Sequence, residues 1–220
     1  MSDSSKQQVR EAIETIRAAG KTAVILARHG QTASNREKRF VGCQDIPLDE
    51  VGQHQARLLA ARLAEISFDV VYASSLSRAI DTASALRTPT IDPDLDELNQ
   101  GVLEGQESHV LAAQYPELLA AWQADPKNTR IPGGESLGDV QLRATSALQR
   151  IVETPPIPKT VAIFTHQMTL ASILCAITDR PLTEYQALCH RNAAFSVLSW
   201  EDGAWELLWR DDQRHLAQTD

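Results

Sequence analysis

The stretch TAVILARHGQT, at residues 22–32, decides the fold class of this chain. Its first part, Ala23–Ala27, is a continuous apolar run that is too short to span a membrane and is typical of a strand buried on both faces. Arg28, His29 and Gly30 follow this run directly. Open α/β sheets place their ligand sites at the carboxyl ends of their strands. The stretch therefore predicts a polar site at the end of a central, parallel strand.

Further strands and helices alternate along the chain. Residues 68–73 (FDVVYA) and 159–165 (KTVAIFT) indicate two more buried strands, and helical patterns lie between the strands. Strand–helix–strand units of this kind form right-handed crossovers in a parallel sheet. Residues 195–200 and 205–209 flank a turn that contains Gly203, which predicts a hairpin. We therefore expect an α/β fold, a three-layer sandwich with a mostly parallel central sheet flanked by helices.

Three segments are expected along the chain: an N-terminal helical extension over residues 1–20, one domain over residues 21–210 and a polar tail over residues 211–220. The extension carries an apolar stripe of Val9, Ala12, Ile13 and Ile16. Such a stripe packs either against its own domain, which is the commoner arrangement, or against a partner such as a second copy of the chain. A homodimer therefore stays open.

Composition narrows the classes of function. The 220 residues include 21 Lys and Arg against 29 Asp and Glu, a net charge of -8, so no nucleic-acid partner is expected. No run reaches membrane-spanning length and residues 1–8 lack the apolar core of a signal peptide, so no membrane association is expected. Cys43, Cys175 and Cys189 are widely spaced, which disfavours a disulfide framework and favours the reducing cytoplasm.

Two of the predicted strands end in a histidine. His29 follows the first strand and His166 follows the strand at residues 159–165, while Arg78 comes shortly after the strand at residues 68–73. Because the carboxyl ends of parallel strands meet at one edge, we expect these residues and Arg28 to converge. One guanidinium group can bind two phosphate oxygens at once, and it stays charged at neutral pH. The sequence therefore predicts a site for a phosphate-bearing anion.

Six motifs together resemble those of the histidine phosphatase superfamily, the phosphoglycerate-mutase-like proteins, and occur in that family's order. They are ARHGQTASN at 27–35, RFVGCQDIPLDEVGQHQARLLAARL at 39–63, YASSLSRAIDTA at 72–83, LDELNQGVLEGQ at 95–106, IPGGESL at 131–137 and VAIFTH at 161–166. Their joint occurrence is more specific than any one motif. The resemblance implies a phosphoglycerate-mutase-like sandwich and, on the phosphatase branch, a histidine acid-type phosphatase.

The resemblance also implies roles for single residues. His29 would attack phosphorus and form a phosphohistidine, and Arg28, Arg78 and His166 would bind the phosphoryl oxygens. Glu97 would protonate the leaving oxygen and then activate water. Glu104 is expected to be structural. The further candidates for binding substrate or phosphate are Asn35, Gln31, Thr32, Gly42, Gln44 and Gln167.

One position departs from the family pattern. Gln167-Met168 follow His166, where the family generally has glycine, so these side chains narrow the pocket, contact the leaving group or disturb backbone donors to phosphate. Glu135 is either a pocket residue or a charge partner of a helix N-terminus. The motifs give no role to the remaining histidines, which are expected on the surface; they are His54, His109, His190 and His215. His190 lies close to Asn192 in the sequence, so an approach of His190 to the pocket stays open.

The segment of residues 105–131 bears on the reaction. Its cations are Lys127 and Arg130, whereas mutases of the family carry a longer basic insertion that retains a phosphorylated intermediate. We therefore expect a phosphomonoesterase that acts on a small phosphorylated metabolite, without a metal or other cofactor. The alternatives are a phosphoglycerate mutase, a non-catalytic phospho-ligand or protein-binding module of the same fold, and a metallohydrolase, which the lack of clustered ligands disfavours. No motif indicates the leaving group.

Overall fold

The central sheet of the computed structural model, which describes residues 3–217, consists of six strands in the order β3-β2-β4-β1-β5-β6. Strand β1 lies inside the sheet, parallel to β4 and antiparallel to β5, with Ala27 opposite Phe164 and Phe195. Strands β2 and β3 continue the parallel part. The mostly parallel sheet is therefore confirmed. The strands are β1 (Thr22–Arg28), β2 (Val70–Ala73), β3 (Thr90–Ile91), β4 (Thr160–Thr165), β5 (Phe195–Glu201) and β6 (Ala204–Asp212).

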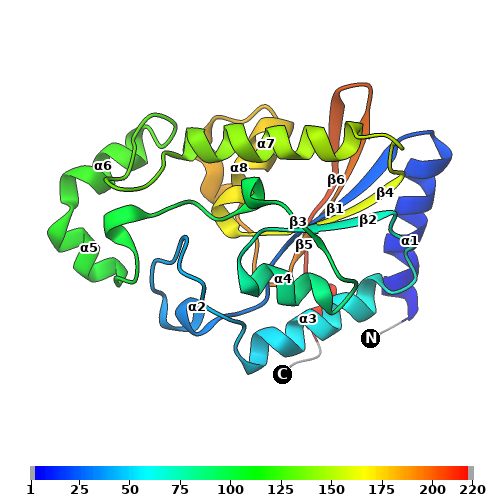
Figure 1. The fold of residues 1–220 in the computed structure, drawn as a ribbon, viewed down its shortest axis with the longest axis horizontal. Coiled ribbons are helices and arrows are strands. Elements are labelled where there is room, and N and C mark those ends of the chain that lie inside the picture. Colours follow the sequence, from blue (N-terminus) through cyan, green and yellow to red (C-terminus); the bar gives the residue numbers. More distant parts are fainter. Residues whose placement is uncertain (1–2, 218–220) are drawn as a thin grey trace.

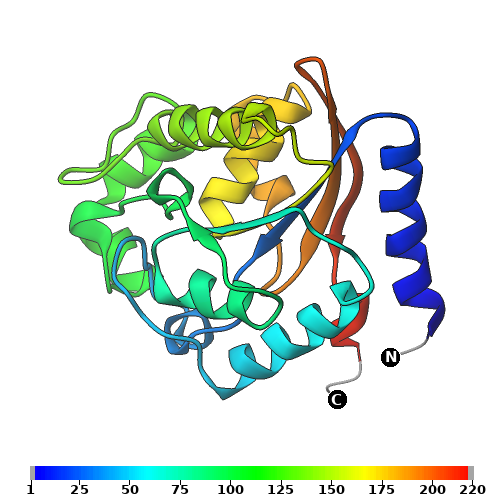
Figure 2. The same ribbon diagram turned by 45° about the vertical axis from the view of Figure 1, so that its right-hand side comes forward.

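Helices cover both faces of the sheet (Figures 1 and 2). One apolar core joins Val24 and Leu26 of β1 to α7 (Leu137–Glu153) and α8 (Gln167–Ile177). A second core joins Ala23 and Ile25 to the helices α1 (Asp3–Ala18), α3 (Glu50–Leu63) and α4 (Ser77–Ser84). Successive residues of a strand point to opposite faces, so residues 23–27 of β1 are all apolar because both faces are covered. The predicted three-layer sandwich is confirmed.

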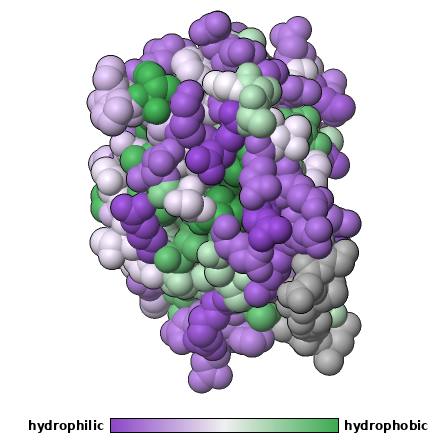
Figure 3. Space-filling view, turned by 90° about the vertical axis from the view of Figure 1, so that its right-hand side faces the viewer, coloured by the Kyte–Doolittle hydropathy of each residue, from purple (hydrophilic) through white to green (hydrophobic). Residues whose placement is uncertain are grey.

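The N-terminal helix α1 packs on its own domain. Val9, Ile13 and Ile16 lie in the second core, with exposed fractions of 1%, 2% and 4%. Arg10 forms an ion pair of 3.1 Å with Glu65, just beyond the end of α3. The side of the molecule that carries α1 is mostly hydrophilic (Figure 3). The stripe is therefore covered by the sheet and α3, the commoner of the two expected arrangements.

The C-terminal segment is more ordered than a polar tail. The range expected as a tail from residue 211 begins inside β6, and Arg214–Leu216 forms a 3-10 turn, η4. Asp212 forms an ion pair of 3.1 Å with Arg62 of α3, whose side chain is fully buried. A buried guanidinium requires a carboxylate partner, which ties this segment to α3. Residues 1–2 and 218–220 of the expected extension and tail lie outside the described residues.

Two of the histidines expected on the surface are buried. His190 and His215 have exposed fractions of 2% and 0%, whereas His54 is exposed as expected. Both buried rings lie within hydrogen-bond distance of a backbone carbonyl oxygen, that of Leu188 or that of Ala193. These bonds give one ring nitrogen of each imidazole a partner, whereas the buried Nδ1 of His215 has no hydrogen-bond partner among the described residues. The side chain of His109 lies outside the described part of the chain.

Two segments differ locally from the pattern predicted by the sequence. The polar, basic sequence of residues 33–46 predicts a loop, but a short helix, α2 (Ala33–Glu37), lies within it. The sequence predicts one helical piece over residues 109–124, whereas the structure has two helices, α5 (Ser108–Gln114) and α6 (Pro116–Ala124), because proline lacks the N–H that a continuous helix needs. Among residues 3–217, no helix has the length and apolarity to cross a membrane.

Candidate active site

The ends of β1, β4 and β2 bring two histidines and two arginines to one edge of the sheet. The ring centroids of His29 and His166 are 5.0 Å apart. Arg78, in the first turn of α4, donates from Nε to His166 Nδ1 at 3.2 Å. Arg28 and Arg78 are each less than a tenth exposed, as are both histidines. The structure thus gathers four groups that are distant in sequence into one buried, cationic cluster.

His29 is held as a neutral ring with one free nitrogen. Its Nδ1 lies 2.6 Å from the carbonyl oxygen of Gly30. A carbonyl only accepts, so Nδ1 carries the proton and Nε2 keeps its lone pair. Burial, and then the charges of Arg28 and Arg78, hold the pKa of His29 well below its ordinary value of 6.5. The ring is therefore an uncharged nucleophile or base at neutral pH.

The second histidine, His166, has the opposite tautomer. Its Nδ1 accepts from Arg78, so the proton of the neutral ring lies on Nε2 and is donated to Ser74 Oγ at 2.5 Å. Burial, and next the charge of Arg78, keep its pKa well below 6.5. Sequence analysis missed Ser74 as a site residue. The available signal is its position directly after β2, equivalent to that of His29 after β1.

The two arginines differ in how their donors are used. Arg28 donates from one terminal nitrogen to the carbonyl oxygen of His190 at 2.7 Å, while its buried Nε has no hydrogen-bond partner among the described residues. Burial lowers the pKa of Arg28 to about 10, so the group stays charged at neutral pH. A buried N–H without an acceptor costs free energy, which an oxygen of a bound anion would recover.

Arg78 is held by the loop that contains Gly42 and Gln44. Its two terminal nitrogens donate to the carbonyl oxygens of these residues, each at 2.8 Å. A Cβ at position 42 would lie 2.1 Å from the carbonyl oxygen of Leu98, which explains the glycine. Glu104 Oε1 accepts from the backbone N–H groups of Gly42 and Cys43. Both candidates thus contribute backbone oxygens, and Glu104 shapes their loop.

The candidates on the loop after His29 bond mainly to one another. Asn35 Oδ1 accepts from the backbone N–H of Thr32 at 3.1 Å and from Asn192 Nδ2 at 3.0 Å. Gln31 Nε2 donates to Asp49 Oδ2 at 3.1 Å. Asn192, which was not among the candidates, also donates to the carbonyl oxygen of His29. These side chains fix the backbone that carries the nucleophile candidate.

Glu97 lies at the N-terminus of α8, with an exposed fraction of 6%. Its carboxylate accepts from the backbone N–H groups of Leu98, Met168 and Thr169 at 2.9–3.3 Å. Among nearby charges, Glu97 has the largest effect on Arg28 and on Arg78, and it raises the pKa of both. The carboxylate therefore faces the arginine cluster from the side of α8.

Gln167 and Met168, where the family has glycine, fit the start of α8. Neither has a positive φ, so the backbone does not need glycine here. The Met168 N–H donates to Glu97. Gln167 lines an open groove of about 890 Å³ together with Arg28, Cys189 and Asn192. The departure from glycine therefore adds a carboxamide to the groove that Arg28 also lines.

The remaining acidic candidate, Glu135, and the possibility of a metal site can also be compared with the structure. The Glu135 carboxylate pairs with Arg143 of α7, Oε1 lying 3.0 Å from Nε. Among the described residues, no three His, Cys, Asp or Glu side chains form a group that could hold a metal ion.

Known proteins resemble this chain over most of its length. A model of the histidine phosphatase superfamily (branch 1) matches residues 24–213. Phosphoserine phosphatase 1 of Hydrogenobacter thermophilus is 30% identical over 200 residues, covering 89% of this chain and 94% of that protein. The probable phosphoglycerate mutase GpmB of Yersinia pestis is 31% identical over 187 residues, covering 83% and 86%.

A solved structure agrees with both. YhfR of Bacillus stearothermophilus superposes with a TM-score of 0.82 at 30% identity, covering 89% of this chain and 99% of that one. These likenesses support a phosphatase of the superfamily as the activity. The chain belongs to the histidine phosphatase superfamily, branch 1.

Proposed function

We propose that this protein is a histidine acid-type phosphomonoesterase that hydrolyses a small phosphorylated metabolite through a phosphohistidine at His29, without a metal ion. The state of His29 carries the proposal. The bond from Nδ1 to the Gly30 carbonyl and the lowered pKa leave Nε2 unprotonated, as an in-line attack on phosphorus requires. A family relative named phosphoserine phosphatase supports the same class of substrate.

In the first half-reaction, the bond from His29 Nε2 to phosphorus forms while the bond from phosphorus to the leaving oxygen breaks. Glu97, in its protonated form, gives its proton to that oxygen, and the product leaves as an alcohol. Arg28 and Arg78 bind the phosphoryl oxygens, and the unpartnered Arg28 Nε is one donor for them. In the second half-reaction, water attacks phosphorus while the bond from phosphorus to His29 Nε2 breaks. The Glu97 carboxylate takes a proton from the water, and inorganic phosphate leaves.

The segment of residues 105–131 favours hydrolysis over a mutase reaction. Arg130, one of its two cations, lies 2.8 Å from Asp139 Oδ2 and also donates to the Gly134 carbonyl. A guanidinium engaged in this way is poorly placed to retain a second phosphate. Because one family relative is named a probable phosphoglycerate mutase, that reaction remains the second candidate.

The intact cluster also favours an enzyme over a binding module. His29, Arg28, Arg78, Glu97 and His166 are all buried at one sheet edge. Gln167 and Met168 enter α8 without a positive φ and leave the Glu97 contacts in place. The three cysteines are free thiols, in keeping with the cytoplasmic location that we propose.

The test is hydrolysis of p-nitrophenyl phosphate from pH 5 to pH 8 in the presence of a chelator. We expect activity in the unmodified protein and a loss on the order of 10⁴–10⁶-fold for His29→Ala. Quenching with labelled substrate should trap a phosphoprotein that is labile in acid and stable in base, and that is absent from His29→Ala.

The other candidates predict different results. Interconversion of phosphoglycerate isomers would establish the mutase, and activity that a chelator removes and a divalent cation restores would establish a metallohydrolase. Failure on p-nitrophenyl phosphate and on a panel of natural phosphomonoesters, with retained phosphate binding, would establish the binding module.

A further inference from the structure

We propose that Arg143 of α7 is the positioning residue that sets the place of Glu97, and that Glu135 in turn orients Arg143. The inference rests on the proposed role of Glu97 as the proton donor. Neither Arg143 nor Glu135 belongs to the buried arginine and histidine cluster. They act through the backbone of the loop that carries Glu97.

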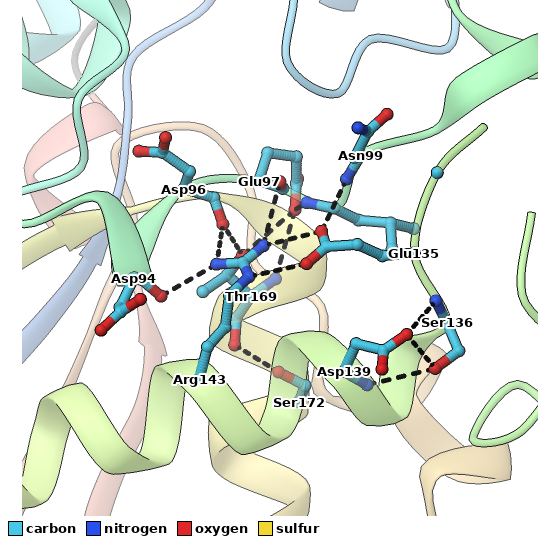
Figure 4. A network of polar contacts seen from close by, with 12 residues as sticks. Asp94, Asp96, Glu97, Asn99, Glu135, Ser136, Asp139, Arg143, Thr169 and Ser172 are labelled. Atoms are coloured by element: carbon cyan, nitrogen blue, oxygen red, sulfur yellow. Dashed lines mark hydrogen bonds and ion pairs between the residues drawn. The ribbon is translucent and has the colours of Figure 1, made fainter.

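One guanidinium holds three carbonyl groups of this loop (Figure 4). A terminal nitrogen of Arg143 donates to the carbonyl oxygens of Asp94 at 2.8 Å and Asp96 at 2.7 Å. The other terminal nitrogen donates to the carbonyl oxygen of Glu97 at 3.1 Å. The loop is therefore fixed on the N-terminal side of Glu97 and at Glu97 itself.

Glu135 completes the arrangement on the other side of the guanidinium. Its two carboxylate oxygens lie 3.0 Å and 3.1 Å from Nε and a terminal nitrogen of Arg143, a bidentate pair. The second oxygen also accepts from the backbone N–H of Asn99 at 2.9 Å. The pair therefore binds the loop both before and after Glu97, and Glu135 neutralises the charge that Arg143 brings into a mostly buried place.

The carboxylate end of Glu97 is tied to a different helix. It accepts from the Met168 and Thr169 N–H groups at the start of α8. Thr169 Oγ1 also donates to the carbonyl oxygen of Asp96 at 2.6 Å. Glu97 thus spans two helices, with its backbone on α7 through Arg143 and its carboxylate on α8. A shift of the loop relative to α8 moves the carboxylate relative to the leaving oxygen.

The geometry requires arginine. Three carbonyl oxygens and a bidentate carboxylate surround one planar group, and the five N–H donors of a guanidinium point in matching directions. A lysine ammonium keeps the charge but has three donors on one atom and reaches fewer of these acceptors. Arg143→Lys therefore separates the charge of the residue from its positioning role.

Arg150 offers a matched control on the same helix. It holds the same loop further upstream, through the side chains of Asp92 at 2.7 Å and Asp94 at 3.0 Å. Within the described part of the chain it forms no hydrogen bond or ion pair with residues 96–99, and its side chain is half exposed. Arg150→Lys therefore tests the effect of loosening the loop without releasing the backbone at Glu97.

The experiment compares kcat/KM for two substrates, p-nitrophenyl phosphate, whose leaving group departs without a proton, and glycerol 2-phosphate, whose alkoxide needs one. For Arg143→Lys we expect a loss of about 10–10²-fold with glycerol 2-phosphate, since misplacement by about 1 Å costs as much. With p-nitrophenyl phosphate we expect a change within about 3-fold, because proton donation matters little there. Arg150→Lys should leave the ratio of the two substrates unchanged.

Glu97→Gln separates this inference from the proposed function. If Glu97→Gln lowers glycerol 2-phosphate hydrolysis selectively but Arg143→Lys lowers both substrates equally, Arg143 is only structural and the inference is wrong. If Glu97→Gln shows no selectivity, the proposed role of Glu97 is wrong. In the double variant, Glu97→Gln with Arg143→Lys, the loss of kcat/KM with glycerol 2-phosphate relative to p-nitrophenyl phosphate should be no larger than in Glu97→Gln alone. If thermal unfolding shows that Arg143→Lys does not fold, Glu135→Gln takes its place. We expect Glu135→Gln to lower kcat/KM with glycerol 2-phosphate more than with p-nitrophenyl phosphate, by a smaller factor than Arg143→Lys.

Discussion

The sheet edge around His29 and the segment that carries α5 and α6 are built in opposite ways. Every residue of β1 and β4 is buried, and their ends carry the buried cluster. Helix α6, with the largely apolar sequence PELLAAWQA, has no fully buried residue: Leu118, Leu119 and Trp122 pack against the core but stay partly exposed. In Figure 1, α5 and α6 lie at the end of the molecule furthest from α1.

The difference separates two requirements of a phosphatase. Groups that bind the phosphoryl oxygens must keep their positions during the reaction, and burial between packed layers provides this. A segment with few buried apolar contacts opens at low free energy and tolerates sequence change. We therefore expect the chemistry to depend on the sheet edge, and the choice of leaving group to vary with residues 105–131.

The largest expected effect is on the sheet edge. Arg78→Gln removes a buried charge and its bonds to the Gly42 and Gln44 carbonyls. We expect kcat/KM for p-nitrophenyl phosphate to fall about 10²–10³-fold, as for the loss of one oxyanion donor. Arg87→Gln, which removes an exposed arginine beyond α4, is the control. A loss below 10-fold for Arg78→Gln would mean that this edge does not carry the chemistry.

A second variant tests whether the scaffold and the site are separable. Ile13→Ala opens a cavity under α1, where Ile13 is 2% exposed. We expect the free energy of unfolding to fall by about 2–5 kcal/mol, while kcat per folded molecule stays unchanged. Denaturant unfolding and steady-state kinetics measure the two quantities. A parallel loss of kcat at temperatures where the variant is fully folded would show that α1 acts on the site.

The pH dependence of stability tests the buried histidines. Burial lowers the pKa of His215 to about 4, while the unfolded chain keeps the ordinary value of 6.5. Between these values the unfolded state binds more protons, so His215 contributes stability above pH 6.5 that is lost as the pH falls toward 4. The same direction holds for His29, His166 and His190.

His215→Gln isolates one of these contributions. Glutamine has an amide N–H that can donate to the Ala193 carbonyl, the partner of His215, and it does not titrate. We expect the Tm of the variant to fall less steeply than that of the unmodified protein between pH 6.5 and pH 4. Equal slopes would mean that His215 titrates alike in the folded and unfolded states.

The smallest expected effect is a difference in amide hydrogen exchange between α6 and α8. Because α6 has no fully buried residue, its backbone amides should exchange with solvent faster than those of α8, whose central residues are buried. Hydrogen exchange followed by mass spectrometry measures the difference. Equal protection of the two helices would remove the contrast between the sheet edge and this segment.

Local patterns were sufficient to predict the central elements of this fold. The apolar run of β1 indicates a strand covered on both faces, and Asp49 and Ser136 stand where helix N-caps belong. The convergence of His29 and His166 follows from parallel topology alone. Glu97 and Arg78 needed the motifs, because a carboxylate and a guanidinium in polar segments are usually solvated.

Other features depend on contacts between residues that lie far apart in the sequence, which local patterns do not predict. Arg143 lies on a helix face like many surface arginines, and its role comes from carbonyls on a loop 46–49 residues away. Asn192 likewise bonds to a residue near the other end of the chain. Two misread segments did have local signals: Thr32 and Asn35 form a capping box with asparagine in place of glutamate, and Pro116 marks the break between α5 and α6.

The pairing of β1 sets the order in which the molecule can be assembled during synthesis. Ala23 pairs with Thr160 of β4 and Ala27 pairs with Phe195 of β5. The first strand to leave the ribosome therefore has no neighbouring strand until β4 and β5 have been synthesised. Chains extend N-terminus first, and contacts of long sequence separation form slowly. Nascent chains that end before β5 leave one edge of β1 without its ladder. Phosphatase activity should therefore arise abruptly near the end of translation, and shorter nascent chains should depend on chaperones to protect an apolar strand.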